Sequence, residues 1–160
     1  MIVISNAGPL IALARIRHFE LLRDLFGHLL IPQAVYEEVV VKGAGRPGAY
    51  ETASACGDWL NVVSVKDVTI VRSLLARLGK GESEAIALAL EKKADLLLMD
   101  DLKARAVAEF MGLAVSGTVG VVFQAYRQGI VSDLKQVLDA LRAKGFWIDD
   151  DVYNRVLRSK

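Results

Sequence analysis

The sequence has little of what builds disulfide-bonded, zinc-binding or strongly basic proteins. Its 160 residues include one cysteine, Cys56, and two histidines, His18 and His28. A single cysteine excludes an internal disulfide and a cysteine-based zinc cluster, and two histidines argue against a histidine-rich metal site. The 20 Lys and Arg residues nearly balance the 19 Asp and Glu residues, and the net charge of +1 excludes a basic nucleic-acid coat. Carboxylates would therefore have to hold any bound metal.

Long hydrophobic runs are missing as well. The apolar segment 1–16 has no basic region before it, and Asn6, Gly8 and Pro9 interrupt it, so it does not resemble a signal peptide. No apolar run approaches the length of about 18 residues that a transmembrane helix needs. We therefore expect a cytoplasmic protein without membrane contact.

Short apolar runs alternate with segments of helical periodicity along the whole chain. Hydrophobic residues make up 53% of the sequence, enough for the core of a single domain over residues 1–160. The runs expected to form strands are 2–5, 28–31, 61–65, 96–99 and 113–115. This alternation predicts an α/β fold with a mainly parallel central sheet of four or five strands flanked by helices. Amphipathic helices are expected at the C-terminus, at about 132–158.

Oxygen-bearing side chains follow the predicted strands, at the sheet edge where α/β proteins bind ligands. Asn6 follows the first strand, Asp100 and Asp101 follow the fourth, and Ser116-Gly117-Thr118 follows the last. Two helices add further carboxylates: Glu37, Glu38, Glu82 and Glu84. A cluster of oxygen ligands without His, Cys or Lys is typical of a Mg²⁺ or Mn²⁺ site. Such ions activate water and stabilise charge on a phosphate during transfer.

These segments together resemble the PIN domain family of metal-dependent ribonucleases, many of which are toxins of toxin–antitoxin pairs. The resemblance runs through IVISNAGPLIALA, IPQAVYEEV, GESEAIALAL and LLLMDDLKARAVA, and so covers nearly the whole chain. The segment GLAVSGTVGVVFQAYRQGIV is similar to a subfamily of small prokaryotic PIN-like proteins, most of them without an assigned function. The resemblance implies a PIN-like fold, a Mg²⁺ or Mn²⁺ cofactor and single-stranded RNA as the substrate.

The resemblance also implies a set of catalytic residues: Asn6, Glu38, Glu82 and Asp100. It implies Glu38, Glu82, Asp100 and Asp101 as metal ligands. Asp101 could also hold the other ligands in position without binding the metal itself. The sequence departs from the family at its first acid, because Asn6 stands where the family has Asp. An amide oxygen can bind Mg²⁺, but it carries no charge and cannot act as a base, so Asn6 lowers the expected metal affinity.

Each acidic position also has a purely structural interpretation. Asp100 or Asp101 could cap the helix that follows. Glu82 and Glu84 could stabilise a helix N-terminus, and at most one of them is expected to face the site. Glu38 is expected to be partly buried, with an Arg or Lys partner as the alternative to a metal.

Three further positions are assigned supporting roles. Thr118 is expected to cap its helix, where the backbone of Gly117 could also hold a phosphate or a water. Arg105 could pair with Asp101 or reach a substrate phosphate.

The aromatic residues Trp59, Phe146 and Trp147 are expected in the core.

The sequence thus leaves three functions open. The first is a metal-dependent ribonuclease, with an antitoxin protein as the partner if it is a toxin. The second is a PIN-fold protein with impaired catalysis that binds RNA or has a regulatory role. Asn6 favours this second function. The third, a phospho-acceptor signalling domain, fits poorly because the first strand ends in Asn and no Lys follows the last. The mean hydropathy of +0.34 predicts an exposed apolar patch and a homo-oligomer, in the simplest case a dimer.

Overall fold

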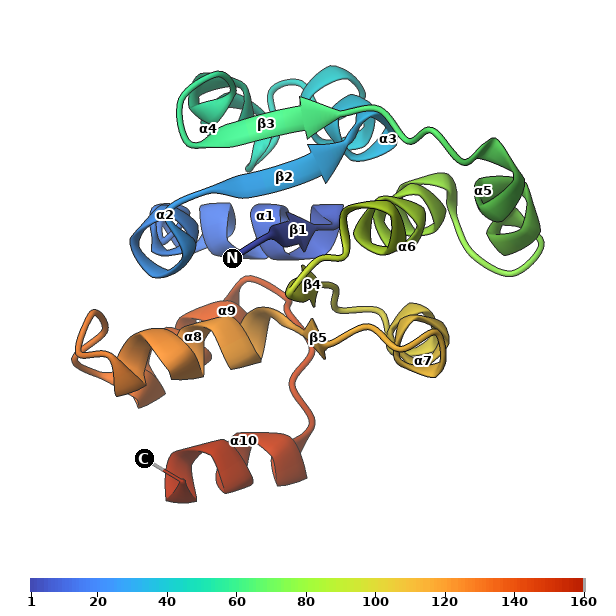
Figure 1. Ribbon diagram of the computed structural model, residues 1–160. Helices are drawn as coiled ribbons and strands as arrows, with labels where there is room; N and C mark the ends of the chain where they lie inside the picture. Colours follow the sequence, from blue (N-terminus) through green and yellow to red (C-terminus); the bar gives the residue numbers. More distant parts are fainter. Residues whose placement is uncertain (160) are drawn as a thin grey trace.

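A five-stranded parallel sheet forms the centre of the molecule, as the computed structural model over residues 1–159 shows (Figure 1). The strands are β1 (Val3–Ser5), β2 (Leu29–Pro32), β3 (Leu60–Val63), β4 (Leu96–Leu98) and β5 (Val115–Ser116). Their order in the sheet is β3-β2-β1-β4-β5. The predicted mainly parallel α/β sheet is confirmed, and β1 lies at its centre.

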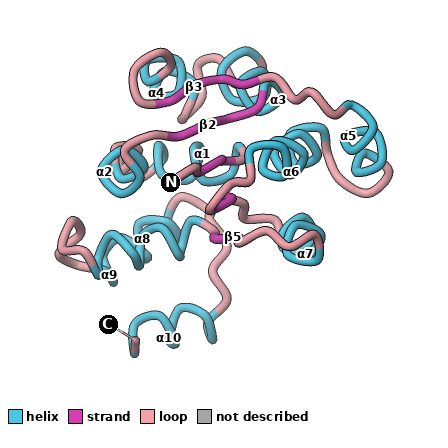
Figure 2. The backbone as a smooth tube through the Cα atoms, viewed as in Figure 1, coloured by secondary structure: helices cyan, strands magenta, loops and turns pink. Residues whose placement is uncertain are grey.

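Helices connect the strands and cover both faces of the sheet (Figure 2). In chain order they are α1 (Ala7–Arg15), α2 (Leu21–Phe26), α3 (Gln33–Tyr36), η1 (Glu37–Val41), α4 (Ala49–Ala55), α5 (Val68–Leu75), α6 (Lys80–Lys92), α7 (Leu102–Phe110), α8 (Thr118–Arg127), α9 (Leu134–Ala143) and α10 (Asp150–Arg158). The helix predicted after Pro32 is thus interrupted, because α3 widens into the π-helical turn η1. Such turns are frequent at functional sites, and η1 carries Glu38.

Successive side chains of each strand point to opposite faces of the sheet and pack in two different hydrophobic cores. On β1, Val3 belongs to the core beneath α1, α2, α8 and α9, while Ile4 belongs to the core beneath α5, α6 and α7. The same alternation continues on β4, where Leu98 joins the first core and Leu97 joins the second. A strand buried on both faces is apolar throughout, which explains why these strands read as continuous apolar runs in the sequence.

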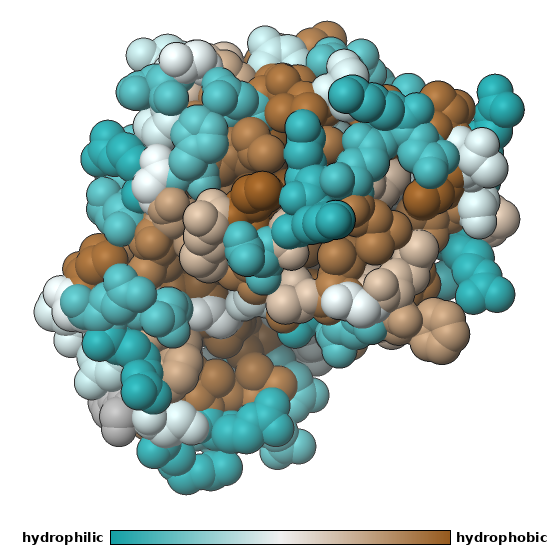
Figure 3. Space-filling view, viewed as in Figure 1, coloured by the Kyte–Doolittle hydropathy of each residue, from teal (hydrophilic) through white to brown (hydrophobic). Residues whose placement is uncertain are grey.

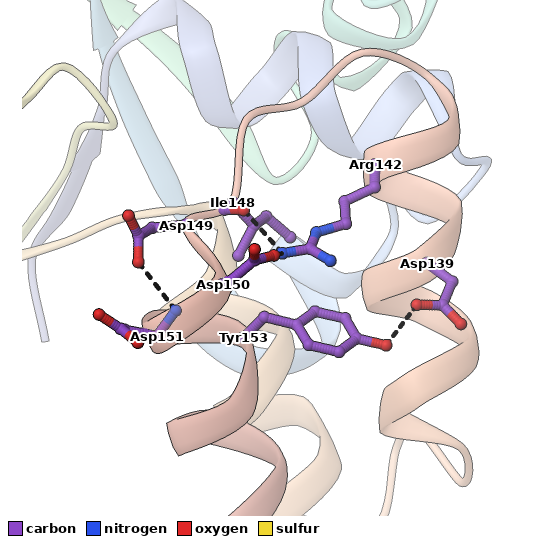
Figure 4. A network of polar contacts seen from close by, with 7 residues as sticks. All are labelled: Asp139, Arg142, Ile148, Asp149, Asp150, Asp151 and Tyr153. Atoms are coloured by element: carbon purple, nitrogen blue, oxygen red, sulfur yellow. Dashed lines mark hydrogen bonds and ion pairs between the residues drawn. The ribbon is translucent and has the colours of Figure 1, made fainter.

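The C-terminal helix α10 stands apart from the sheet and is held mainly by α9 (Figures 1 and 4). Arg142 of α9 donates to the carbonyl oxygen of Ile148 at 2.8 Å and pairs with Asp150 at 3.0 Å. The guanidinium carbon of Arg142 also lies 4.0 Å from the centre of the Tyr153 ring, and the Tyr153 hydroxyl donates to Asp139. This polar network adds to the packing of α10 on the first core, where four of its side chains are partly buried and none is fully buried: Val152, Tyr153, Val156 and Leu157.

The expectation that the aromatic residues lie in the core is correct for Trp59 and wrong for Trp147. Trp59 is buried and packs against the Phe19 ring at 5.5 Å between ring centres. Phe146 is half-buried, whereas Trp147 is 84% exposed. The difference arises because residues 145–149 form the link to α10 and lie away from the sheet.

Within residues 1–159, no helix is both long and apolar enough to cross a bilayer.

Truncating Leu22 tests how the core is built. Leu22→Ala removes a side chain with no exposed surface and should lower the free energy of unfolding by about 2–5 kcal/mol. Leu75→Ala is the matched control, because Leu75 is 44% exposed and should cost less than about 1.5 kcal/mol. Urea denaturation followed by circular dichroism measures both values. Equal losses in the two variants would contradict this description of the core.

Candidate active site

Pairing between β1 and β4 brings the two halves of the candidate site together. The register aligns Ser5 with Leu98, and the Asn6 N–H continues the ladder by donating to the Leu98 carbonyl oxygen at 2.9 Å. The strand order reverses between these two strands, because the chain runs outward from β1 to β3 and then returns to β4. Ligands of open α/β sheets bind at such a point, outside the carboxyl ends of the strands. Asn6 and Asp100 therefore lie at the position where a ligand is expected.

Asp100 is anchored by the start of α8. Its Oδ1 accepts from the Thr118 N–H at 2.7 Å, and its Oδ2 accepts from the Thr118 hydroxyl at 2.6 Å. Burial raises the pKa of Asp100, while these hydrogen bonds and the charge of Arg105 act in the opposite direction. A carboxylate offers about four acceptor positions, so Asp100 can still bind another ligand. Thr118 thus fixes the orientation of Asp100, and the helix-capping role predicted for Thr118 is wrong, because Gly117 occupies the cap position.

Asn6 and Glu38 approach the same space from different elements. Asn6 is 8% exposed, and its Oδ1 has no hydrogen-bond partner. A Cβ built on Gly81 would lie 3.4 Å from this oxygen and 3.0 Å from Oε1 of Glu38. An unpaired buried acceptor costs about 1–3 kcal/mol, so it calls for a partner that the protein itself does not supply.

Glu38 stands on the exposed side of η1, contrary to the burial predicted for it. The widened turn accounts for this position, since it shifts the side chain toward α6 and away from the apolar face of Val35 and Val39. Desolvation by the surrounding atoms and the negative charge of Glu82 raise the pKa of Glu38, and Lys42 partly offsets the rise. A carboxylate whose pKa is raised by a neighbouring carboxylate favours a cation beside it.

The remaining candidate acids hold helix ends. The Glu82 carboxylate accepts from the Gly79 N–H at 3.1 Å at the start of α6, while remaining close enough to act on Glu38. Glu84 accepts from the Ala34 N–H at 3.0 Å and so supports the start of α3. Asp101 caps α7 by accepting from Ala104 at 2.8 Å. Of each predicted pair, Glu82 and Asp100 thus lie nearer the site, and Glu84 and Asp101 support the elements that carry it.

Three glycines leave space around the site oxygens: Gly8, Gly81 and Gly117. A Cβ on Gly8 would lie 3.0 Å from Oδ2 of Asp100, and a Cβ on Gly117 would lie 2.7 Å from Oδ1 of the same residue. None of the three has a positive φ, so their backbone conformations do not require glycine. Space is the remaining reason, because a methyl group at any of them would crowd the site. Of these glycines, only Gly117 was predicted to lie at the site. The signal for the other two was their position in sequence, since Gly8 follows Asn6 by two residues and Gly81 directly precedes Glu82.

Arg105 faces Asp100 across Gly117, not Asp101 as the sequence suggested. The Cβ position of Gly117 lies 2.8 Å from Nη1 of Arg105 and 2.7 Å from Oδ1 of Asp100. The two groups form no ion pair within 4.0 Å among the described residues, although the charge of Arg105 acts on the pKa of Asp100. A half-buried guanidinium is therefore available to an anion at the edge of the site.

The residues present suit a divalent cation held partly through water. Within residues 1–159, no three His, Cys, Asp or Glu side chains converge closely enough to enclose an ion by themselves. The unpaired Oδ1 of Asn6, the adjacent Glu38 carboxylate and the space above Gly81 nevertheless form a cradle that a Cβ would fill. Mg²⁺ keeps several waters and needs only one or two carboxylates. The donor set fits this mode of binding, with Asn6, Glu38 and Asp100 as the residues that would hold the ion.

The fold and the site define a small α/β protein with an acidic site at the topological switch point. Residues 2–160 match the family described as a PIN domain. Because the match spans almost the entire sequence, the chain belongs to the PIN domain family, as the motifs predicted. A search of curated proteins finds no match.

Replacing Glu38 by Gln should stabilise the metal-free protein at neutral pH. The raised pKa means that the folded state binds the Glu38 proton more tightly than the unfolded state. The wild type therefore loses stability as the pH rises through the pKa of Glu38, and Glu38→Gln should lose less. Urea denaturation in EDTA at several pH values measures this difference, with Glu37→Gln as the control. A larger pH dependence in Glu38→Gln than in the wild type would contradict the assigned environment.

Proposed function

We propose that the protein is a divalent-metal-dependent endoribonuclease that hydrolyses phosphodiester bonds of single-stranded RNA. The observation that carries the proposal is the buried, unpaired Oδ1 of Asn6, which shares the space above Gly81 with the Glu38 carboxylate. A buried acceptor beside a carboxylate favours a hard cation, and membership of the PIN domain family supports a nuclease reaction.

The roles of the residues follow from their positions. A bound divalent ion supplies Lewis-acid stabilisation of charge on the phosphate and lowers the pKa of a water. Asn6, Glu38 and Asp100 would hold the ion, and Thr118 sets the orientation of the Asp100 carboxylate. Glu82 adds negative charge next to Glu38, which favours Mg²⁺ or Mn²⁺ over an uncharged occupant. Arg105 lies where it can donate to a phosphate oxygen.

A second candidate function is an RNA-binding or regulatory protein without turnover. The observation that favours it is Asn6 itself, because its amide brings no charge to the metal and cannot accept a proton. The two candidates share the fold and the RNA ligand, and they differ only in whether the ion is held tightly enough for catalysis.

The biological setting is a finer part of the proposal. A toxin that is blocked by an antitoxin protein agrees with the family, and an RNA substrate agrees with a cytoplasmic location. A homodimer is supported by two apolar side chains on α7, since Leu102 is 80% exposed and Phe110 is 93% exposed.

Cleavage of single-stranded RNA tests the proposal directly. The wild type should cut in Mg²⁺ or Mn²⁺ and not in EDTA, and Asp100→Asn should lower kcat by about a hundredfold or more, since the metal supplies several kcal/mol of stabilisation. Asp101→Asn should keep more activity, because Asp101 caps α7. A silent wild type with an active Asn6→Asp would favour the second candidate, and full activity of Asp100→Asn would contradict the site.

Gly81→Ala tests the cradle separately from the acids. Its methyl group would meet the oxygens of Glu38 and Asn6, so Mn²⁺ affinity should fall by about tenfold or more while the helix stays intact. Gly79→Ala is the matched control, because its Cβ would meet only Oε1 of Glu82, at an ordinary distance of 3.6 Å. Mn²⁺ titration followed by electron paramagnetic resonance measures both. Equal affinity in the two variants would place the ion elsewhere.

A further inference from the structure

A groove opens from Asp100 toward the C-terminal helix. It encloses a cavity of about 610 Å³ between α7, α8 and α10, and its lining includes Asp100, Gly117 and Trp147. Brown apolar surface gathers over this recess in the lower part of Figure 3, between α10 and the body of the molecule. The volume lies within the range of 300–1,000 Å³ that is typical of small-ligand sites.

The walls of the groove combine apolar, aromatic and cationic side chains. Phe123 of α8, Phe146 of the linking segment, and Val152 and Val156 of α10 line it and are partly buried against the first core. Two arginines line it, Arg105 near Asp100 and Arg155 on α10, while Glu109 and Asp149 bring negative charge to its rim. Of these acids, Asp149 is engaged with the backbone of Asp151 as the cap of α10.

Trp147 is the most unusual residue of this groove. It is 84% exposed, although tryptophan is a large apolar side chain that folding normally shields. Trp59, in contrast, is buried in the core. The backbone next to it is anchored, because the Ile148 carbonyl oxygen accepts from Arg142 (Figure 4) and the Ile148 side chain is buried. The groove therefore presents an aromatic side chain to solvent.

We propose that this groove binds the nucleotide next to the cleaved phosphate, with its base against Trp147 and Phe146 and its two flanking phosphates facing Arg105 and Arg155. The inference rests on the proposed function. A phosphodiester held at Asp100 must continue into adjoining space, and this groove begins at Asp100. Unstacked RNA bases stack on aromatic side chains, and arginines bind phosphates, so single-stranded RNA suits both kinds of wall.

Trp147→Ala tests the base-binding surface. Binding of a short labelled single-stranded RNA, measured by fluorescence anisotropy in an Asp100→Asn background with Mg²⁺, should weaken by roughly 5- to 150-fold, because stacking on one aromatic is worth about 1–3 kcal/mol. Trp147→Phe should retain most of the affinity. Tyr50→Ala is the matched control, since Tyr50 is 81% exposed on α4 and does not line the groove. RNA should also quench the Trp147 fluorescence.

Arg155→Gln tests the phosphate contact on α10. It should weaken RNA binding and reduce the slope of log Kd against log salt by roughly 0.7, as expected for one lost phosphate contact to a single strand. Arg158→Gln is the control, because Arg158 lies on the same helix and does not line the groove. In the cleavage-competent chain, Trp147→Ala should raise KM more than it lowers kcat.

The outcomes separate this inference from the proposed function. If the wild type binds or cuts RNA while Trp147→Ala and Tyr50→Ala behave alike, the groove proposal is overturned and the function stands. If Trp147→Ala leaves RNA binding unchanged but alters the sedimentation coefficient, the groove holds a second copy of the chain instead. If no variant binds or cuts single-stranded RNA, the proposed function fails, and the groove proposal fails with it.

Discussion

The parallel pairing of β1 with β4 is the constraint on which the rest of the site depends. It joins segments that are about ninety residues apart in sequence and sets Asn6 beside the end of β4, through the bond from its N–H to the Leu98 carbonyl. Burial of Ile4 and Leu98 on opposite faces fixes this register, because a shift by one residue would turn both side chains to the wrong side. The core thus determines where the polar residues lie, and α1, α6 and α8 begin around that point.

Several residues near the site hold the candidate site residues in position. Thr118 occupies both oxygens of Asp100 on one side, which leaves the remaining acceptor positions of Asp100 directed elsewhere. Glu84 and Asp101 fix the starts of α3 and α7, and so hold the elements that carry Glu38 and Arg105. Carboxylates of the same sequence motif therefore divide into those that face the open space and those that support the backbone around it.

The sequence was sufficient for the fold class, the approximate positions of the strands and the order of the acidic segments, because each depends on local apolar runs and on the rule that parallel strands end at one edge. The strand bounds differ by a few residues, as for the last strand, predicted at 113–115 and observed at Val115–Ser116. It could not separate Asp100 from Asp101 or Glu82 from Glu84, since both members of each pair suit a helix start equally well. Their assignment depends on contacts such as the bond from Glu84 to Ala34, which joins residues fifty positions apart. The exposure of Trp147 was missed for a similar reason, because its surroundings are set by how α10 packs on α9.

The charges around position 6 explain why Asn can stand there in place of the Asp of the family. In a site where Glu38 already has a raised pKa beside Glu82, a further carboxylate at position 6, which is buried, would add negative charge close to Glu38. The neutral amide avoids that repulsion in the metal-free protein, while its oxygen still points at the cradle above Gly81. Asn6 thus favours stability of the metal-free protein over metal affinity, and the proposed cation would be attracted mainly by Glu38, Glu82 and Asp100. Space around the site oxygens is as important here as charge. Gly8, Gly81 and Gly117 provide this space.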